Sequence, residues 1–101
     1  MENKKMLQHV ILIKFNSNTE AEQITKLKEM LALLPSQIKE IKSFVFGTDI
    51  IKTPRSYDFA LVSTFDDTPA LVRYQQHEKH IPVSEFVRII SESVVVVDFE
   101  F

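Results

Sequence analysis

The chain has 101 residues, of which 45% are hydrophobic and 26% are charged, and its net charge is −2 at neutral pH. This length suits one hydrophobic core, so residues 1–101 are expected to form a single domain. The slightly acidic balance offers no basic surface for nucleic acid or an anionic membrane. No cysteine is present, which excludes disulfides, thiolate catalysis and cysteine-ligated metals and fits a reducing compartment.

The chain also lacks several signals that would place it in other classes. Gly47 is its only glycine, and that count excludes the glycine-rich phosphate loops of nucleotide-binding proteins. The first six residues lead directly into a strand-like segment, without a long apolar run or a small-residue cleavage site. We therefore expect a cytoplasmic protein with no membrane or nucleic-acid partner.

The first part of the chain predicts a strand followed by a helix. Residues 7–15 are rich in β-branched and aromatic side chains, as strands are. Thr19 and Glu22 match a capping box and predict a helix start. Apolar residues then recur at helical spacing and form one stripe: Ile24, Leu27, Met30, Leu31 and Leu34. Pro35 is expected to end the regular helix or to open a short second turn through Ile41.

The middle of the chain predicts two strands and the start of a second helix. Residues 42–50 form the first of these strands, in which Gly47 marks a bulge or a close backbone approach. Residues 57–65 form the next strand. The sequence D-D-T-P at 66–69 predicts a helix entry, with Asp67 or Thr68 as the cap and a proline in the first turn.

The last third predicts a broken helical region and a final strand. Pro82 is expected to interrupt the helix, and residues 83–92 to form its second piece. The apolar residues of this piece are expected to face inward: Phe86, Val87, Ile89 and Ile90. Residues 94–101 form the last strand. The resulting order, β-α-β-β-α-β, predicts a ferredoxin-like α+β fold with a four-stranded antiparallel sheet and helices on one face.

Both faces of this predicted sheet are apolar. Ile11 and Ile13 alternate with Val10 and Leu12 in the first strand, and the last strand shows the same double-sided pattern. A sheet with helices on one side should carry a polar outer face. We therefore expect a second copy of the chain to cover the other face, giving a homodimer, although a wider helical cover would also serve.

The ordered set of motifs resembles the stress-responsive α/β-barrel (Dabb) domain family over nearly the whole chain. The matching pieces are H-V-I-L-I-K-F at 9–15, Gly47, Y-D-F-A-L-V at 57–62, Phe65, Leu71, Tyr74, His77, His80 and V-V-V-D-F at 95–99. The resemblance implies a dimeric α+β barrel. Most members of this family have no assigned activity. Its best understood catalytic relatives are plant polyketide cyclases, which close a polyketide by aldol chemistry with a tyrosine and histidines.

The resemblance also implies roles for four residues. His80 matches the general base of those cyclases, and Tyr74 matches the donor that polarises a carbonyl. His9 and His77 match pocket residues. A histidine titrates near neutral pH and a phenol can donate to a developing oxyanion, so the residue types suit this chemistry. The family's usual helix end is His-Pro-x-His, whereas here Glu78 replaces the proline that would fix the backbone leading to His80.

Other interpretations of these residues stay open. A tyrosine and a histidine on a half-buried helix are often packing residues. His77 and His80 form a bare histidine pair, too few ligands for a transition metal, so we predict no metal site and no cofactor. A haem-degrading monooxygenase-like protein, with His77 as the axial ligand, rests on fold analogy alone.

Two hypotheses of function follow from the sequence. In the first, an apolar cleft beside Tyr74 binds a small hydrophobic or aromatic molecule without turnover. In the second, the protein is a polyketide-cyclase-like or isomerase-like enzyme that uses His80 and Tyr74. Two further acidic residues on strands, Asp58 and Asp98, are expected to face each other or the solvent.

Overall fold

The computed structural model describes residues 4–101, which form one four-stranded sheet and three helices. In chain order the elements are β1 (Leu7–Phe15), α1 (Ala21–Gln37), β2 (Ser43–Thr48), β3 (Phe59–Phe65), α2 (Thr68–Gln76), α3 (Ile81–Ile90) and β4 (Ser91–Glu100). The strand order is β2-β3-β1-β4, and every neighbouring pair is antiparallel. This arrangement confirms the predicted ferredoxin-like fold.

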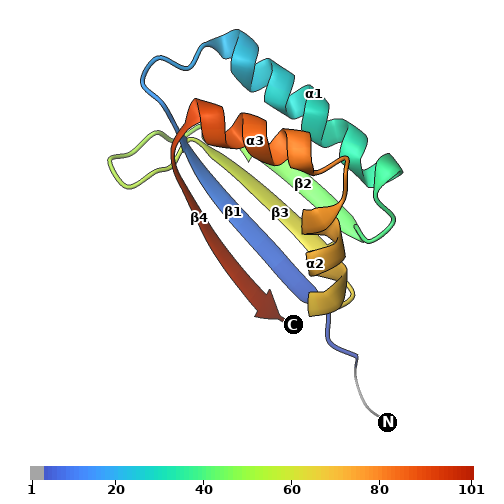
Figure 1. Ribbon diagram of the computed structural model, residues 1–101. Helices are drawn as coiled ribbons and strands as arrows, with labels where there is room; N and C mark the ends of the chain where they lie inside the picture. Colours follow the sequence, from blue (N-terminus) through green and yellow to red (C-terminus); the bar gives the residue numbers. More distant parts are fainter. Residues whose placement is uncertain (1–3) are drawn as a thin grey trace.

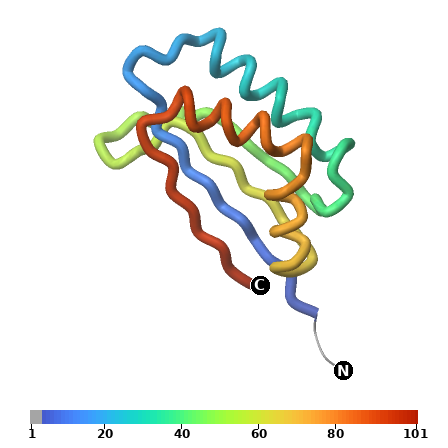
Figure 2. The backbone as a smooth tube through the Cα atoms, in the orientation of Figure 1, coloured from blue at the N-terminus to red at the C-terminus, as the bar shows by residue number. Residues whose placement is uncertain are grey.

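All three helices cover the same face of the sheet (Figure 1). The tube view in Figure 2 shows α1 and α3 running side by side across the sheet, with α2 at the end where β1 begins and β3 ends. No helix of residues 4–101 combines the length and the apolar character that a membrane crossing requires. The other face of the sheet carries no helix and is called the open face below.

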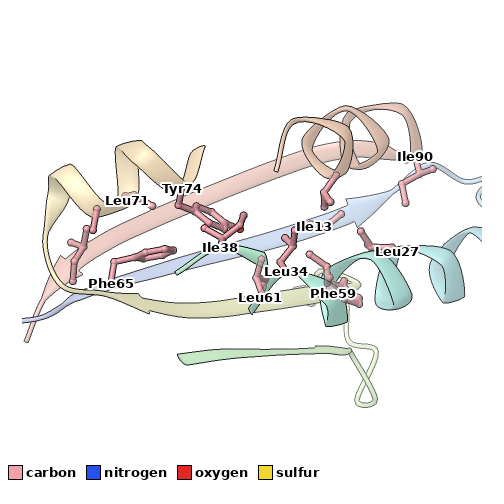
Figure 3. Close-up of a cluster of buried hydrophobic side chains, with 14 of the residues drawn as sticks. Ile13, Leu27, Leu34, Ile38, Phe59, Leu61, Phe65, Leu71, Tyr74 and Ile90 are labelled. Atoms are coloured by element: carbon pink, nitrogen blue, oxygen red, sulfur yellow. The ribbon is translucent and has the colours of Figure 1, made fainter. Parts of the chain in front are cut away.

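The core lies between the helices and the sheet. In α1 the buried residues Leu27, Leu31 and Leu34 fall four and three positions apart, so they share one side of the helix. Ile24 and Met30 are partly buried at the edge of the same stripe, which confirms the predicted pattern. Figure 3 shows Leu27 and Leu34 close to Phe59 and Leu61, while Phe65 and Tyr74 fill the other end of the same core beside Leu71.

The start of α1 differs from the prediction by one residue. Glu20 is the cap, and its backbone amide donates to Oε1 of Gln23 at 2.9 Å. The predicted cap, Thr19, instead donates its hydroxyl to the carbonyl oxygen of Ile90 at 2.8 Å. The threonine therefore ties the start of α1 to the end of α3, a long-range contact that local sequence does not reveal.

Pro35 and Pro82 lie inside helices rather than between them. α1 passes through Pro35, because a proline in the last turn removes only one hydrogen bond close to the helix end. Pro82 lies in the first turn of α3, where its missing amide would have no partner within the helix, so it begins the helix and does not interrupt one. Asp67 caps α2 as predicted, since its Oδ1 accepts from the amide of Ala70 at 2.9 Å.

The predicted inward face of α3 is partly wrong. Ile90 is buried, and Phe86 and Val87 are partly buried against the core. Ile89, however, is 62% exposed, and the second buried residue of this helix is Val83. The helix ends earlier than expected because Ser91 already pairs with β1 at the start of β4.

The open face is lined by small and β-branched apolar residues in register. One row across the four strands consists of valines only: Val45, Val62, Val10 and Val97. The next row is Gly47, Ala60, Leu12 and Val95. Val45 is 67% exposed and Val97 is 62% exposed, so one chain leaves much of this surface in water. The apolar second face that the alternation predicts is therefore present.

Gly47 marks neither a bulge nor a close approach within the chain. It pairs with Ala60 in unbroken register, its φ is not positive, and a Cβ there would meet no heavy atom within 4 Å. What the glycine does create is a depression in the open face. A hollow of about 450 Å³ lies over Gly47 and Ala60, with Leu12, Val45 and Val62 around it.

Candidate functional site

The candidate site is a cavity of about 210 Å³ between the sheet and the junction of α2 with α3. Most of its wall is aliphatic and is built from Ile11, Ile13, Leu31, Leu61, Val83, Val87, Val94 and Val96. The polar side chains at the wall are those of His9, Tyr74, Gln75, His80 and Ser84. Val94 and Val96 are 41% and 48% exposed, which places the mouth of the cavity beside β4.

Tyr74 is the most deeply buried polar residue of this wall. It lies in α2 and is 1% exposed. Figure 3 shows its side chain reaching from α2 into the space between the helices and the sheet, where its ring centroid is 4.8 Å from that of Phe65. Burial raises the pKa of the Tyr74 phenol well above its ordinary value, so the hydroxyl stays neutral and can donate a hydrogen bond.

His80 lies beside Tyr74 at the start of α3, with the two ring centroids 4.4 Å apart. Its Nδ1 is 3.2 Å from the carbonyl oxygen of Gln75. A carbonyl oxygen only accepts, so Nδ1 carries the hydrogen and Nε2 of the neutral ring is left as an acceptor. Burial lowers the pKa of His80, and the nearby His9 and His77 lower it further, while the hydrogen bond to Gln75 partly opposes this shift.

His77 is the predicted site residue that the structure does not bring into the cavity. It lies at the C-cap of α2 and is not part of the cavity wall. Its Nδ1 accepts from the backbone amide of Lys79 at 3.0 Å, and its carbonyl oxygen accepts from the amide of His80 at 2.9 Å. These two bonds hold the turn where Glu78 replaces the family's proline, so His80 is positioned without it.

His9 is almost completely buried, at 3% exposure, although it lies on a strand. Its ring stands edge-on to Phe65 with centroids 6.3 Å apart. Its Nδ1 contacts Oδ1 of Asp98, the residue directly opposite it in the pairing of β1 with β4. The structure therefore gathers His9, Tyr74 and His80 at one cavity. Asp98 is not part of the cavity wall, but it contacts His9 from β4, a contact that the sequence interpretation did not include.

Asp98 and Asp58 do not face each other. The side chain of Asp98 is 37% exposed and also contacts His9, whereas Asp58 is hydrogen-bonded within the chain. Asp58 lies just before β3, where its Oδ2 accepts from the backbone amide of Phe15 at 2.9 Å. Val97 lies on the open face, and successive side chains of a strand point to opposite faces. Asp98 and Val96, on either side of Val97, therefore lie on the helix-covered face of β4. This alternation is a signal in the sequence that could have placed Asp98 on the helix-covered face. The partner, His9, could not be read from sequence, because the two residues are 89 positions apart.

A second cavity, of about 280 Å³, lies below the loop between β2 and β3. Lysines and aspartates of opposite charge line it together, among them Lys52 and Asp49. Asp49 is committed to the loop, since its Oδ2 accepts from the amide of Lys52, a residue with a positive φ of 57°. Residues 4–101 contain no group of three or more histidines or acidic residues that could hold a metal ion.

Comparison with known structures finds the same fold in dimeric proteins. A dimeric ferredoxin-like protein of unknown function from Thermobifida fusca superposes with a TM-score of 0.88 at 27% identity, over 96% of this chain and 92% of that chain. The hydroxynitrile lyase of Passiflora edulis superposes with a TM-score of 0.87 over 98% of this chain and 95% of that chain. Its identity is only 16%, so the two proteins are similar in fold.

Comparison of sequences gives the family. An uncharacterised protein of Streptomyces coelicolor is 31% identical over 98 residues, which are 95% of this chain and 100% of that protein. The sequence model of the Stress responsive A/B Barrel Domain, Dabb, matches residues 7–101. The chain belongs to the stress-responsive A/B barrel (Dabb) domain family.

Proposed function

We propose that this chain forms a homodimer and that the cavity at Tyr74 binds a small hydrophobic or aromatic molecule. The observation that carries the binding function is the composition of that cavity. Its wall is aliphatic, and the few polar groups at it converge from different elements: His9 from β1, Tyr74 from α2 and His80 from the α2–α3 turn. Such a wall, with a small number of placed polar groups, is typical of small-molecule sites.

The open face supports the homodimer. Its two apolar rows, the valine row and the Gly47 row, would remain in contact with water in a single chain, which costs free energy in proportion to the apolar area. A second copy presents the same rows, so two open faces stacked on each other exclude water from both. The hollow over Gly47 and Ala60 offers room for a side chain of the second copy. Structural neighbours of this chain are dimeric ferredoxin-like proteins, which supports a homodimer.

Sedimentation equilibrium tests the dimer. The wild-type chain should give twice the mass of one chain, and Val45→Glu should give a single-chain mass, because a carboxylate would be buried against the partner. Ile89→Glu is the matched control, since Ile89 is similarly exposed, at 62% against 67%, but lies on α3. A wild-type mass equal to one chain would refute the dimer.

The polar groups of the cavity restrict the ligand. Because the Tyr74 hydroxyl is neutral and buried, it suits a carbonyl or other neutral acceptor on an otherwise apolar molecule. A charged ligand would lose its hydration without an opposite charge on Tyr74 or His80 to replace it. The volume of about 210 Å³ also limits the ligand to the size of one or two fused aromatic rings.

Titration with matched probes tests ligand binding. We expect 2-acetylnaphthalene to bind more tightly than naphthalene, because only the ketone accepts from Tyr74. In Tyr74→Phe the ketone should lose roughly tenfold in affinity, the worth of one buried hydrogen bond, while naphthalene keeps its affinity. Failure of both probes to bind the wild-type protein would contradict the proposal. Native mass spectrometry of the protein from its own source would then show whether any ligand is carried.

The contact of Tyr74 with His80 favours a second candidate, a polyketide-cyclase-like or isomerase-like enzyme. The lowered pKa of His80 keeps its imidazole neutral near pH 7, as a general base must be. In this reaction Nε2 of His80 would take a proton from the carbon next to a ketone, and the enolate oxygen would accept a hydrogen bond from Tyr74. Return of this proton from His80 to a different carbon of a conjugated enolate, or to the opposite face of the same carbon, completes an isomerisation.

Hydrogen exchange detects this chemistry directly. In D₂O near pH 7, an enzyme of this kind should speed the exchange of the methyl protons of 2-acetylnaphthalene for deuterium. His80→Gln should abolish the acceleration, and Tyr74→Phe should reduce it by about 10²-fold or more. Binding of the ketone without any accelerated exchange would leave the binding function and exclude this enolisation.

A further inference from the structure

We propose that Asp98 is a positioning residue that holds His9 in one tautomer, and that His9 in this form recognises a hydroxyl group on the ligand. The inference rests on the proposed function, because it assigns a ligand group to the same cavity. It adds a second polar contact, on the β1 side of the cavity, to the one that Tyr74 makes from α2. The sequence motifs contain both residues, but they neither pair Asp98 with His9 nor assign Asp98 a role.

The first step is the direction of the hydrogen bond between the two residues. Oδ1 of Asp98 contacts Nδ1 of His9. An ionised carboxylate can only accept, so the hydrogen lies on Nδ1 of the imidazole. In the neutral ring Nε2 is then without a hydrogen and can only accept. This is the logic by which a carboxylate fixes the tautomer of a histidine in other active sites.

The second step is the rigidity of the pair. His9 and Asp98 are directly opposite each other in the ladder between β1 and β4. Facing residues in an antiparallel pair lie close together, and a slip of one residue would turn Asp98 toward the open face. The ring is also packed edge-on against Phe65 and is 3% exposed. Backbone pairing and packing therefore hold the imidazole in one orientation.

The third step is the access of the second nitrogen to the cavity. His9 is part of the cavity wall. Among residues 4–101, Ser91 Oγ is the one fully buried side-chain polar atom that has no hydrogen-bond partner. Nε2 of His9 has no hydrogen-bond partner either, yet it is not a second such atom, so it is not fully buried and keeps some exposed surface. A fixed acceptor at an apolar cavity suits a ligand hydroxyl, which would donate to Nε2, and leaves the Tyr74 hydroxyl to donate to another oxygen of the ligand.

The first test is spectroscopic and needs no ligand. In ¹⁵N-labelled protein at pH 8, long-range ¹H–¹⁵N spectra should show His9 with hydrogen on Nδ1, the form that free histidine disfavours. Asp98→Asn should remove this fixed state, because an amide can donate as well as accept. Glu100→Gln, on the same face of the same strand, is the matched control and should leave the His9 signals unchanged. Wild-type His9 with hydrogen on Nε2 would overturn the inference.

The second test compares two probes that differ by one methyl group. At pH 7 we expect the wild-type protein to bind 2-naphthol roughly tenfold more tightly than 2-methoxynaphthalene, which cannot donate. Asp98→Asn should bring this ratio close to one, with the affinity for 2-methoxynaphthalene unchanged. Equal binding of the two probes to the wild type would contradict recognition of a hydroxyl.

The two proposals fail in different ways. If neither naphthalene probe binds, the ligand-binding function is wrong. The NMR measurement of the His9 tautomer then still shows whether Asp98 positions that ring. If 2-methoxynaphthalene binds but the hydroxyl gives no gain, the ligand site stands and the role given to His9 is wrong.

Discussion

The two faces of the sheet are both apolar, yet they differ in what is placed among the apolar residues. On the open face the valine row and the Gly47 row run from edge to edge without a titratable side chain. On the helix-covered face a buried histidine and a carboxylate, His9 and Asp98, stand opposite each other among valines and isoleucines, below Tyr74 and His80. The two apolar rows can do little except pack, whereas the helix-covered face can also form directed polar contacts with a ligand.

This difference shows how an interface can be told from a binding site when hydrophobicity cannot separate them. A surface that meets an identical copy needs shape and apolar area, and β-branched residues on a pleated sheet supply both. A site for a small molecule needs, in addition, a few polar groups held at fixed points. The predictions below test this division between the faces.

The largest effect is expected from a core phenylalanine on the helix-covered face. Phe65 is 0% exposed, so Phe65→Ala should lower the free energy of unfolding by about 3–5 kcal/mol at any protein concentration. Phe99, by contrast, is 47% exposed in one chain. The loss caused by Phe99→Ala should depend on protein concentration, because it acts through the dimer. Urea denaturation at two protein concentrations distinguishes the two variants. A loss of unfolding free energy in Phe99→Ala that does not depend on concentration would contradict the division between the two faces.

The next effect concerns the hollow over Gly47. Gly47→Leu should leave the fold intact, because a Cβ there meets nothing within the chain, but should fill the hollow and dissociate the dimer. Ala32 is also a small exposed residue but lies on α1, away from the open face, so Ala32→Leu is the control. Light scattering should show half the mass for the first variant only. An intact dimer in Gly47→Leu would mean that the partner does not enter this hollow.

A smaller effect is expected when the pH is lowered. Burial holds the pKa of His80 below its ordinary value of 6.5, so the unfolded chain takes up this proton first as the pH falls. The contribution of His80 to stability is therefore complete above about pH 6.5 and is lost below it. Denaturation at pH 7.5 and 5.0 should show a smaller loss in His80→Gln than in the wild type. His9 and His77 are close enough to influence this ring, Tyr74 contacts it, and all three remain unchanged in the variant.

The smallest effect is expected at the turn between α2 and α3. His77→Ala removes the acceptor for the amide of Lys79 and should cost about 0.5–1 kcal/mol, since the bond is exposed. His77→Asn can restore an acceptor and should recover part of this loss. Denaturation curves measure both variants. A loss of several kcal/mol would show that His77 does more than hold the turn.

Much of the fold could be predicted because its signals are local. The stripe from Ile24 to Leu34 and the Asp67 cap depend on residues within one helix, and the structure has both. The two apolar faces follow from alternation within single strands. One error arose where a distant contact decided the outcome: Thr19 bonds to the end of α3 instead of capping α1.

The site could be predicted only in part for the same reason. Tyr74 and His80 are close in sequence, and their convergence on one cavity agrees with the family motif. The motif also includes His77, but the turn directs its ring to the amide of Lys79 rather than to the cavity. Asp98 was missed because strand pairing brings it to His9, and the register of that pairing cannot be read from either strand alone.

The most direct test of the division between the faces is a titration of 2-acetylnaphthalene into the Val45→Glu variant. Val45 lies on β2, at the edge of the sheet opposite β4, and is not part of the cavity wall. If the open face serves only pairing and the cavity belongs to one chain, this variant should be a monomer and should bind the ketone with the wild-type dissociation constant. A monomer that no longer binds the ketone would contradict this account.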